Sequence, residues 1–149
     1  MNVIGEFSVA ASNQSVFATL RDPSSFVKFV DGISDLKEIS PNLYSAVFET
    51  KVAYLKFRFN VTVEVTRMES PNLIEARIEG VPLGVVGRLT ATSVTTLAES
   101  GDETKVNYSV VSALAGKLGS LGQPVLRSKA KDMEKVFARR LRAHFAPKP

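Results

Sequence analysis

The feature that most constrains the fold of this chain is a strict alternation of apolar and polar side chains over residues 56–67. Apolar side chains occupy every second position of this run: Phe57, Phe59, Val61, Val63 and Val65. Because successive side chains of a strand point to opposite faces of a sheet, this period of two predicts a strand with one apolar and one solvated face. An apolar sheet face must be covered by a second layer, so we expect a sheet with a packed partner layer.

Further strands are predicted on both sides of this run. They cover residues 3–10, 36–39, 43–52, 73–79, 88–98 and 104–114. Short polar turns, such as residues 70–72 and 99–103, join successive strands and predict antiparallel neighbours. We expect residues 80–87 to form a loop that leads into the next strand. The first strand can pair with the last, which covers one edge of the sheet.

Two short helices are predicted after the first strand. Ser12 or Asn13 can cap a helix that ends at Leu20, because either side-chain oxygen accepts from free backbone N–H groups. After a break at residues 22–24, a second short helix is predicted at 25–30. Its apolar side chains should turn inward: Phe26, Phe29 and Val30.

The C-terminal segment carries the pattern of a long amphipathic helix. Apolar side chains recur at intervals of three to five residues from Leu118 to Phe145. A helix over residues 124–146 would be about 34 Å long, and Pro124 suits its first turn, where a missing N–H costs nothing. The glycines of residues 116–122 predict a flexible connection before it. This order of elements predicts an α+β architecture in a single domain, residues 1–149.

The composition excludes several kinds of site. The chain has no cysteine and one histidine, His144, which excludes disulfides, thiolate metal sites and a multi-histidine zinc site within one chain. No local sequence pairs a serine with a base or spaces two carboxylates for acid–base chemistry. We therefore expect no catalytic residue, no metal and no cofactor. Neither a membrane span nor a signal peptide is recognisable, so we expect a cytoplasmic protein.

The basic charge of the chain is concentrated in its last segment. Residues 1–116 carry ten basic and thirteen acidic side chains, whereas residues 117–149 carry nine and two. The basic side chains expected on the surface of the long helix are Lys131, Lys135, Arg139, Arg140 and Arg142. This face is either simply solvated or contacts anionic lipid headgroups or an acidic partner. Exposed aromatic residues are not interleaved with the basic side chains of this helix, so we expect no nucleic-acid partner.

Motifs along the chain resemble those of a known family. They are Gly5-Glu6-Phe7, Val16-Phe17, Leu20-Arg21-Asp22-Pro23, Glu79-Gly80, Gly84, Gly87, Val106-Asn107-Tyr108 and Ala115-Gly116-Lys117-Leu118-Gly119. In their order and spacing, residues 2–145 resemble the carbon monoxide dehydrogenase G-subunit family within the START/Bet v 1-like (SRPBCC) helix-grip superfamily. The resemblance implies a curved antiparallel sheet of about seven strands wrapped around the long C-terminal helix.

The resemblance also implies a partner and a place of action. Members of this family are linked to molybdenum-containing dehydrogenases, which they are thought to recruit to the membrane or to supply with a quinone-like lipid. Many members continue into a hydrophobic tail, whereas this chain ends at Pro149. We therefore expect a peripheral contact at the inner face of the membrane to use the domain surface itself.

A ligand site is expected between the sheet and the long helix. Helix-grip folds generally hold a cavity there, and ligand sites are mostly apolar. If the alternation continues to the last strand, Ser93, Thr95 and Ser112 share the inner face, and such small side chains favour a hollow interior over a packed one. The predicted ligand-binding residues are Phe48, Phe57, Phe59, Val61, Ile78, Leu89, Tyr108, Val110, Leu126, Met133 and Phe137. For each of them, plain core packing is the alternative.

Three hypotheses of function remain open. The first is non-enzymatic binding of a hydrophobic small molecule, quinone-like or lipid-like. The second is an assembly or recruitment factor that binds an acidic protein through the basic helix without a ligand. The third is a cyclase-like or hydrolase-like enzyme, which some helix-grip folds support and which would need a catalytic group in the pocket.

Overall fold

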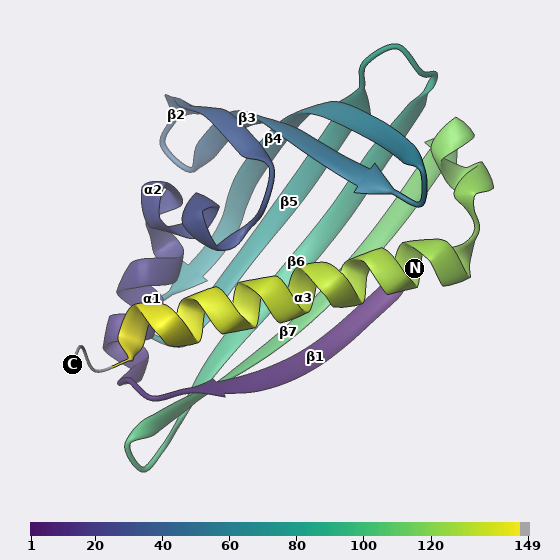
Figure 1. Ribbon diagram of the computed structural model, residues 1–149. Coiled ribbons are helices and arrows are strands. Elements are labelled where there is room, and N and C mark those ends of the chain that lie inside the picture. The colour runs from purple at the N-terminus through teal and green to yellow at the C-terminus, as the bar shows by residue number, and fades with distance from the viewer. Residues whose placement is uncertain (147–149) are drawn as a thin grey trace.

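The computed structural model describes residues 1–146, which form a curved antiparallel sheet crossed by a long helix (Figure 1). The strands lie in the order β1-β7-β6-β5-β4-β3-β2. They are β1 (Asn2–Val9), β2 (Ile33–Ser40), β3 (Leu43–Val52), β4 (Leu55–Glu69), β5 (Leu73–Pro82), β6 (Gly87–Ser100) and β7 (Glu103–Gly116). The helical elements are α1 (Asn13–Arg21), α2 (Pro23–Phe26), the 3-10 helices η1 (Val27–Phe29) and η2 (Lys117–Leu121), and α3 (Gln123–Phe145). The predicted α+β architecture and the pairing of the first strand with the last are confirmed.

The helix α3 spans the concave side of the sheet and is held at the edges (Figure 1). Its closest backbone approaches are to β1, η1 and β3. Arg127 Nη1 donates to the carbonyl oxygen of Asn2 (3.3 Å), and Arg142 Nε donates to that of Ser8 (3.0 Å). These contacts tie the helix to the edge strand β1, whose backbone groups would otherwise be open to another chain.

Two predicted strand boundaries are wrong. The short strand predicted at 36–39 is longer, because β2 begins at Ile33. The predicted loop 80–87 is shorter, because β5 continues to Pro82, which is opposite Phe59 in the register. A proline is tolerated at a strand end, and the following N–H, of Leu83, still donates to Arg58 O (2.8 Å).

The predicted break after the first helix is confirmed, because α1 ends at Arg21 and Asp22 is extended, but the second helix starts at Pro23 rather than at residue 25. Asp22 Oδ1 accepts from Ser24 N (3.1 Å), and Pro23 occupies the first helical position. An aspartate cap followed by proline is a helix start, so the helix predicted at 25–30 is divided into α2 and η1. Phe29 is buried as predicted, whereas Phe26 stays partly exposed. Ser12, rather than Asn13, caps α1.

The glycine-rich connection before α3 is ordered into η2. Gly116 (φ 68°) and Gly122 (φ 88°) flank η2 with backbone angles that favour glycine. Between them, Leu118 is buried with only 2% of its surface exposed. The glycines therefore let the chain turn tightly from β7 into α3 while one leucine anchors the turn.

The hydrophobic core is divided into two clusters. The larger contains Phe7, Val9, Val16, Phe17, Leu20, Phe29, Leu97, Val106, Ala138 and Leu141. The smaller contains Val52, Phe57, Phe59 and Leu118, with Phe48, Val61, Leu114 and Leu121 packed against it. The larger cluster joins α1, the C-terminal half of α3 and the neighbouring strand ends. The smaller one joins η2 to the opposite ends of the strands.

The two ends of the sheet carry different connections. We call the end with the β4–β5 and β6–β7 turns and α1 the polar end. We call the opposite end, formed by residues 51–56, 81–88 and 115–122, the loop end. One backbone bond joins two of these segments, because Lys117 N donates to Val86 O (3.0 Å), and a second ties residues 81–88 to β4, because Leu83 N donates to Arg58 O (2.8 Å). Figure 1 shows these segments together at the upper right.

Candidate functional site

The inner face of the sheet is defined by the strand register. Val63 on β4 is opposite Ile78, which is opposite Ala91 on β6, which in turn is opposite Ser112 on β7. Residues directly opposite in an antiparallel sheet share a face. The same register places Ser93 between Ala76 and Val110, and Thr95 between Ile74 and Tyr108. The alternation expected for residues 88–114 is therefore present, and the small hydroxyl side chains lie on the face that α3 covers.

A strip in the middle of this face is less buried than its ends. We call Val63, Ile78, Ser93, Val110 and Ser112 the central strip; all five are half-buried. In a fully packed layer, the middle of the inner face would be the most buried part, because it lies farthest from every edge. Apart from Ala76 and Ala91, which are buried beside the strip, the buried side chains of this face gather in the two end clusters. Water therefore reaches an apolar surface between the sheet and α3.

The helix above the strip presents small or flexible side chains. Leu126 and Ala130 are half-buried, and Met133 is 36% exposed although it belongs to the same stretch of α3. Methionine is unbranched and adapts its shape to irregular gaps. The helix therefore covers this face incompletely and leaves apolar and hydroxyl side chains half-exposed, a lining of the kind that small-molecule sites use.

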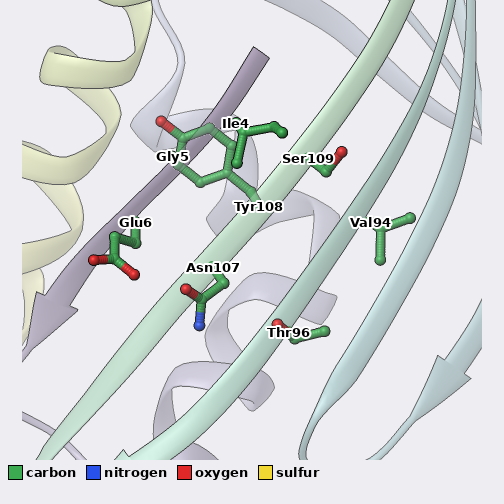
Figure 2. Close-up of a pocket in the computed structure, with 8 residues that line it drawn as sticks. All are labelled: Ile4, Gly5, Glu6, Val94, Thr96, Asn107, Tyr108 and Ser109. Carbon is green, nitrogen blue, oxygen red and sulfur yellow. The ribbon is translucent and has the colours of Figure 1, made fainter. Parts of the chain in front are cut away.

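Tyr108 provides the most unusual polar group of the inner face. Its hydroxyl is buried and makes no well-formed hydrogen bond within residues 1–146, although the Glu134 carboxylate of α3 is near enough to act on it. Burial, reinforced by the neighbouring Glu134 carboxylate of α3, raises the pKa of the Tyr108 hydroxyl above its ordinary value. The ring lies across β1 at Gly5, where an added Cβ would overlap the hydroxyl (Figure 2). An unpaired buried hydroxyl costs free energy, so a ligand that bonds to it would recover that cost.

The predicted ligand-binding residues fall into two groups. Ile78, Leu89, Val110, Leu126 and Met133 lie around the central strip and are not fully buried. The four phenylalanines and Val61 are packed instead. Phe57 and Phe59 belong to the smaller cluster, with Phe48 and Val61 against it, and Phe137 contacts the rings of Phe7, Phe26 and Phe29. Tyr108, the remaining predicted residue, packs against the larger cluster beside Phe7. Large aromatic side chains fill the two ends, and the strip between them is lined by smaller residues.

Two residues beside the strip were not predicted. Glu134 is half-buried on α3 near Tyr108, and Gly5 is the position that accepts the Tyr108 ring. The signal for Glu134 was present in the sequence, because it lies four residues after Ala130 and four before Ala138 on the inner face of the helix. The role of Gly5 depends on the register between β1 and β7, which places it opposite Tyr108 and which the local sequence does not encode.

The basic side chains of α3 have different surroundings. Arg140 Nη2 lies 2.6 Å from Asp31 Oδ1, and Arg142 lies over the ring of Phe7 at 5.6 Å while bonding to β1. These two residues fix the helix to the body of the domain. Lys131, Lys135 and Arg139 are exposed, and none of them pairs with a carboxylate within residues 1–146.

A shallow hollow of about 440 Å³ lies on the opposite, outer face of the sheet (Figure 2). Its lining comes from β1, β6 and β7: Ile4, Gly5, Glu6, Val94, Thr96, Asn107, Tyr108 and Ser109. Ile4 is exposed beside the charged Glu6. The hollow is open to solvent and is separated from the central strip by the sheet, so the two are distinct surfaces.

Metal-binding groups and membrane-spanning helices were sought in the described part of the chain. Residues 1–146 contain no group of three or more histidine, aspartate or glutamate side chains that could hold a metal ion. His144 is exposed and packs edge-to-face against Phe29 and Phe145. None of the helices in this range has the length and hydropathy needed to cross a membrane.

The fold and the half-open concave face define a class of protein. A curved seven-stranded antiparallel sheet, short helices after the first strand and a long C-terminal helix form the START/Bet v 1-like (SRPBCC) helix-grip fold. A conserved protein from Geobacillus kaustophilus has this fold, at 23% identity, covering 97% of this chain and 95% of that chain with a TM-score of 0.89. A protein from Chromobacterium violaceum matches with a TM-score of 0.72 at 14% identity, covering 99% of this chain and 98% of that one.

Within this class, the sequence identifies the family. The model of the carbon monoxide dehydrogenase G-subunit (CoxG) family matches residues 5–146, and the chain belongs to that family. The di-domain ARO/CYC protein BexL from the BE-7585A biosynthetic pathway shares the fold at 15% identity, with a TM-score of 0.65, over all of this chain and 51% of BexL. Among curated proteins, no match is found. The family and the fold indicate a ligand-binding or accessory role.

Proposed function

We propose that this protein binds an apolar small molecule of the quinone or lipid class, without catalysis, between the central strip and α3. The observation that carries the proposal is the division of the core: two packed clusters flank a half-buried apolar strip that the helix spans without filling. Burying such a strip under a ligand removes apolar surface from water, which is worth about 25 cal/mol per Å².

Tyr108 supplies the polar contact in this proposal. Its unpaired hydroxyl can donate to a carbonyl or ether oxygen of the ligand, and its raised pKa keeps it protonated as a donor. Mostly apolar walls with one or two polar groups are typical of sites that hold a small molecule in one orientation. Ser93, Thr95 and Ser112 offer further hydroxyl groups along the same face.

The test is to fill the strip with a side chain. Ser93→Phe places a ring on the inner face of β6, whereas Thr92→Phe places the same ring on the exposed outer face of the same strand. Native mass spectrometry of gently purified protein, followed by titration with decylubiquinone and palmitate, measures binding. We expect wild type and Thr92→Phe to carry or take up a ligand and Ser93→Phe to lose it. A wild-type protein that takes up neither probe and carries no adduct would contradict the proposal.

The second candidate function is recruitment of an acidic protein partner, which membership of the family suggests is a molybdenum-containing dehydrogenase. The observation that favours it is the exposure of Lys131, Lys135 and Arg139, which have no carboxylate partner in residues 1–146. Reversing the charge of all three should abolish capture of the partner from a lysate of cells that express it. Reversing Arg58 and Arg77, which form outer-face ion pairs, is the matched control.

A further inference from the structure

The course of α3 along the edge strand β1 is fixed at two points (Figure 1). Near the start of the helix, Arg127 Nη1 donates to Asn2 O (3.3 Å). Near its end, Arg142 Nε donates to Ser8 O (3.0 Å). At about 1.5 Å per helical residue and about 3.4 Å per strand residue, α3 and β1 cover about 22 Å and about 20 Å between these points. The middle of this stretch of α3 therefore lies beside the middle of β1.

The residues at the middle are Glu134 on α3 and Gly5 on β1. Gly5 is the position over which the Tyr108 ring lies, with its hydroxyl where an added Cβ would be (Figure 2). Glu134 is half-buried, whereas Lys135 beside it is exposed, so Glu134 is the residue turned toward the sheet. The Glu134 carboxylate and the Tyr108 hydroxyl therefore meet between α3 and β7.

Neither group of this pair is fully satisfied by the described part of the chain. The Tyr108 hydroxyl makes no well-formed hydrogen bond within residues 1–146. In the same range, Glu134 forms no ion pair with a basic side chain. Burial, and then the carboxylate, raises the pKa of the Tyr108 hydroxyl, which stays protonated. The pair thus offers one donor and one acceptor to a third group.

The pair borders the central strip. Val110, a member of the strip, is two residues after Tyr108 on the same face of β7. Thr95 of β6 is directly opposite Tyr108 and carries a further hydroxyl group on this face. A molecule that lies along the strip can therefore bring its polar end to Tyr108 and Glu134.

We propose that Tyr108 and Glu134 select a neutral apolar ligand with a hydroxyl headgroup, such as an alcohol, a phenol or a hydroquinone, over an apolar carboxylate. This inference rests on the proposed function, because it names the headgroup of the molecule that occupies the same site. A hydroxyl group can donate to the Glu134 carboxylate and accept from the Tyr108 hydroxyl at once. A ketone oxygen only accepts and leaves the carboxylate without a donor, whereas a ligand carboxylate meets a like charge.

The experiment compares probes that share an apolar chain and differ in the headgroup. Decanol and decanoate are titrated into the full chain by isothermal titration calorimetry at about pH 7.5, where the carboxylate is ionised. We expect wild type to bind decanol about tenfold more tightly than decanoate, or better, because hydrogen bonds to charged groups are the strong ones. Decylubiquinol should bind more tightly than decylubiquinone for the same reason.

Glu134→Gln tests the carboxylate, and Asp132→Asn is its matched control. Glu134→Gln should weaken decanol binding and strengthen decanoate binding, so that the ratio of the two Kd values approaches one. A residue that only supports the fold would weaken both probes together and leave this ratio unchanged. Asp132→Asn removes the same charge from an exposed position of α3 and should keep the wild-type ratio. Tyr108→Phe should weaken both probes, because both accept from its hydroxyl.

The outcomes separate this inference from the proposed function. Equal affinity of wild type for decanol and decanoate, or an unchanged ratio in Glu134→Gln, overturns the selection and leaves ligand binding intact. A wild-type protein that takes up no probe contradicts the proposed function, and the inference falls with it. Glutamine is close in size to glutamate, so a thermal melt should show that Glu134→Gln stays folded. The wild-type ratio tests the selection without any variant.

Discussion

The polar end and the loop end of this domain differ in how many side chains they bury and in which side chains their turns expose. At the polar end, ten buried hydrophobic residues form one cluster, and the turns carry carboxylates such as Glu69, Glu99 and Asp102. At the loop end, only four residues are fully buried together, and the turns carry apolar and basic side chains in solvent. The difference teaches that stability is concentrated at one end, which leaves the other end free to expose surface that folding would normally hide.

The polar contacts repeat this contrast. Near the polar end, Thr104 Oγ1 donates to Ala11 O (2.7 Å), and Asn13 Nδ2 donates to Asn72 Oδ1 (3.1 Å). Both Thr104 and Asn13 are buried, and they fix α1 to the turns of the sheet. At the loop end, the bonds between the described segments are backbone bonds alone, apart from Ser120 Oγ, which donates to Lys117 O within η2.

The largest expected effect separates the two core clusters. Leu141→Ala in the larger cluster should lower the free energy of unfolding by about 3–5 kcal/mol, because rigid neighbours leave a cavity. Leu118→Ala should cost about 2–3 kcal/mol, because η2 can move in toward the strands. Urea unfolding followed by circular dichroism measures both. Equal losses would mean that the two ends are equally rigid.

The next effect tests the close contact between β1 and β7. Gly5→Ala adds a Cβ that overlaps the Tyr108 hydroxyl, and we expect a loss of about 1–3 kcal/mol. Adding Tyr108→Phe should recover part of this loss, because it removes the overlapping oxygen. Tyr108→Phe alone should stabilise the protein slightly, since it removes a buried hydroxyl that has no partner among the described residues. A double variant as unstable as Gly5→Ala would show that the backbone, rather than the ring, resists the change.

Tyr108 also gives the protein a pH dependence in the alkaline range. Its pKa is raised in the folded state, so above the ordinary value of about 10 the unfolded chain loses this proton first. The unfolded state then binds fewer protons than the folded state, and stability falls as the pH rises. Tyrosine titrates at roughly pH 9 to pH 11. In this range, the free energy of unfolding should fall less steeply with rising pH in Tyr108→Phe than in wild type. Parallel curves would contradict the burial of the hydroxyl.

A smaller effect distinguishes the arginines of α3. Arg140→Ala breaks the 2.6 Å pair with Asp31 that attaches the C-terminal half of the helix near η1. Because the pair is partly exposed, the expected loss is about 0.5–1 kcal/mol. Arg139→Ala removes a neighbouring exposed charge without a partner in the described residues, and should change the stability by less than about 0.5 kcal/mol. Asp31→Asn should match Arg140→Ala if the pair accounts for the loss.

The smallest expected effect is a gain in stability at the loop end. Lys51→Glu replaces a like-charge pair across β3 and β4 by an opposite-charge pair with Lys56, which should stabilise the protein by about 0.2–1 kcal/mol at low salt. The gain should vanish at high salt. If the variant is less stable than wild type, the pair of lysines does not destabilise the loop end.

The sequence by itself determined the architecture of this protein. The alternation at Phe57–Val65, the turn residues and the amphipathic C-terminal segment predict the sheet and the long helix, because both patterns are local and have fixed periods. The inner face was also predictable, since the alternation of Leu89, Ala91 and Ser93 continues without a bulge into the register with β7. Two of the three boundaries that failed lie at Pro23 and Pro82, where proline can begin or end an element as well as break one, and the third is the start of β2 at Ile33.

Only the tertiary structure decided which inner-face residues are packed and which are open. Phe57, Phe59 and Val63 look alike in the sequence pattern, yet the first two are buried under η2 and the third lies in the half-open strip. The pairing of Tyr108 with Gly5, and the gathering of Tyr54, Val86 and Lys117 at one end, join positions far apart in the chain. Periodicity reports which face a side chain points to. How deeply that face is covered depends on where the helix crosses the sheet, and that is set by contacts between distant segments.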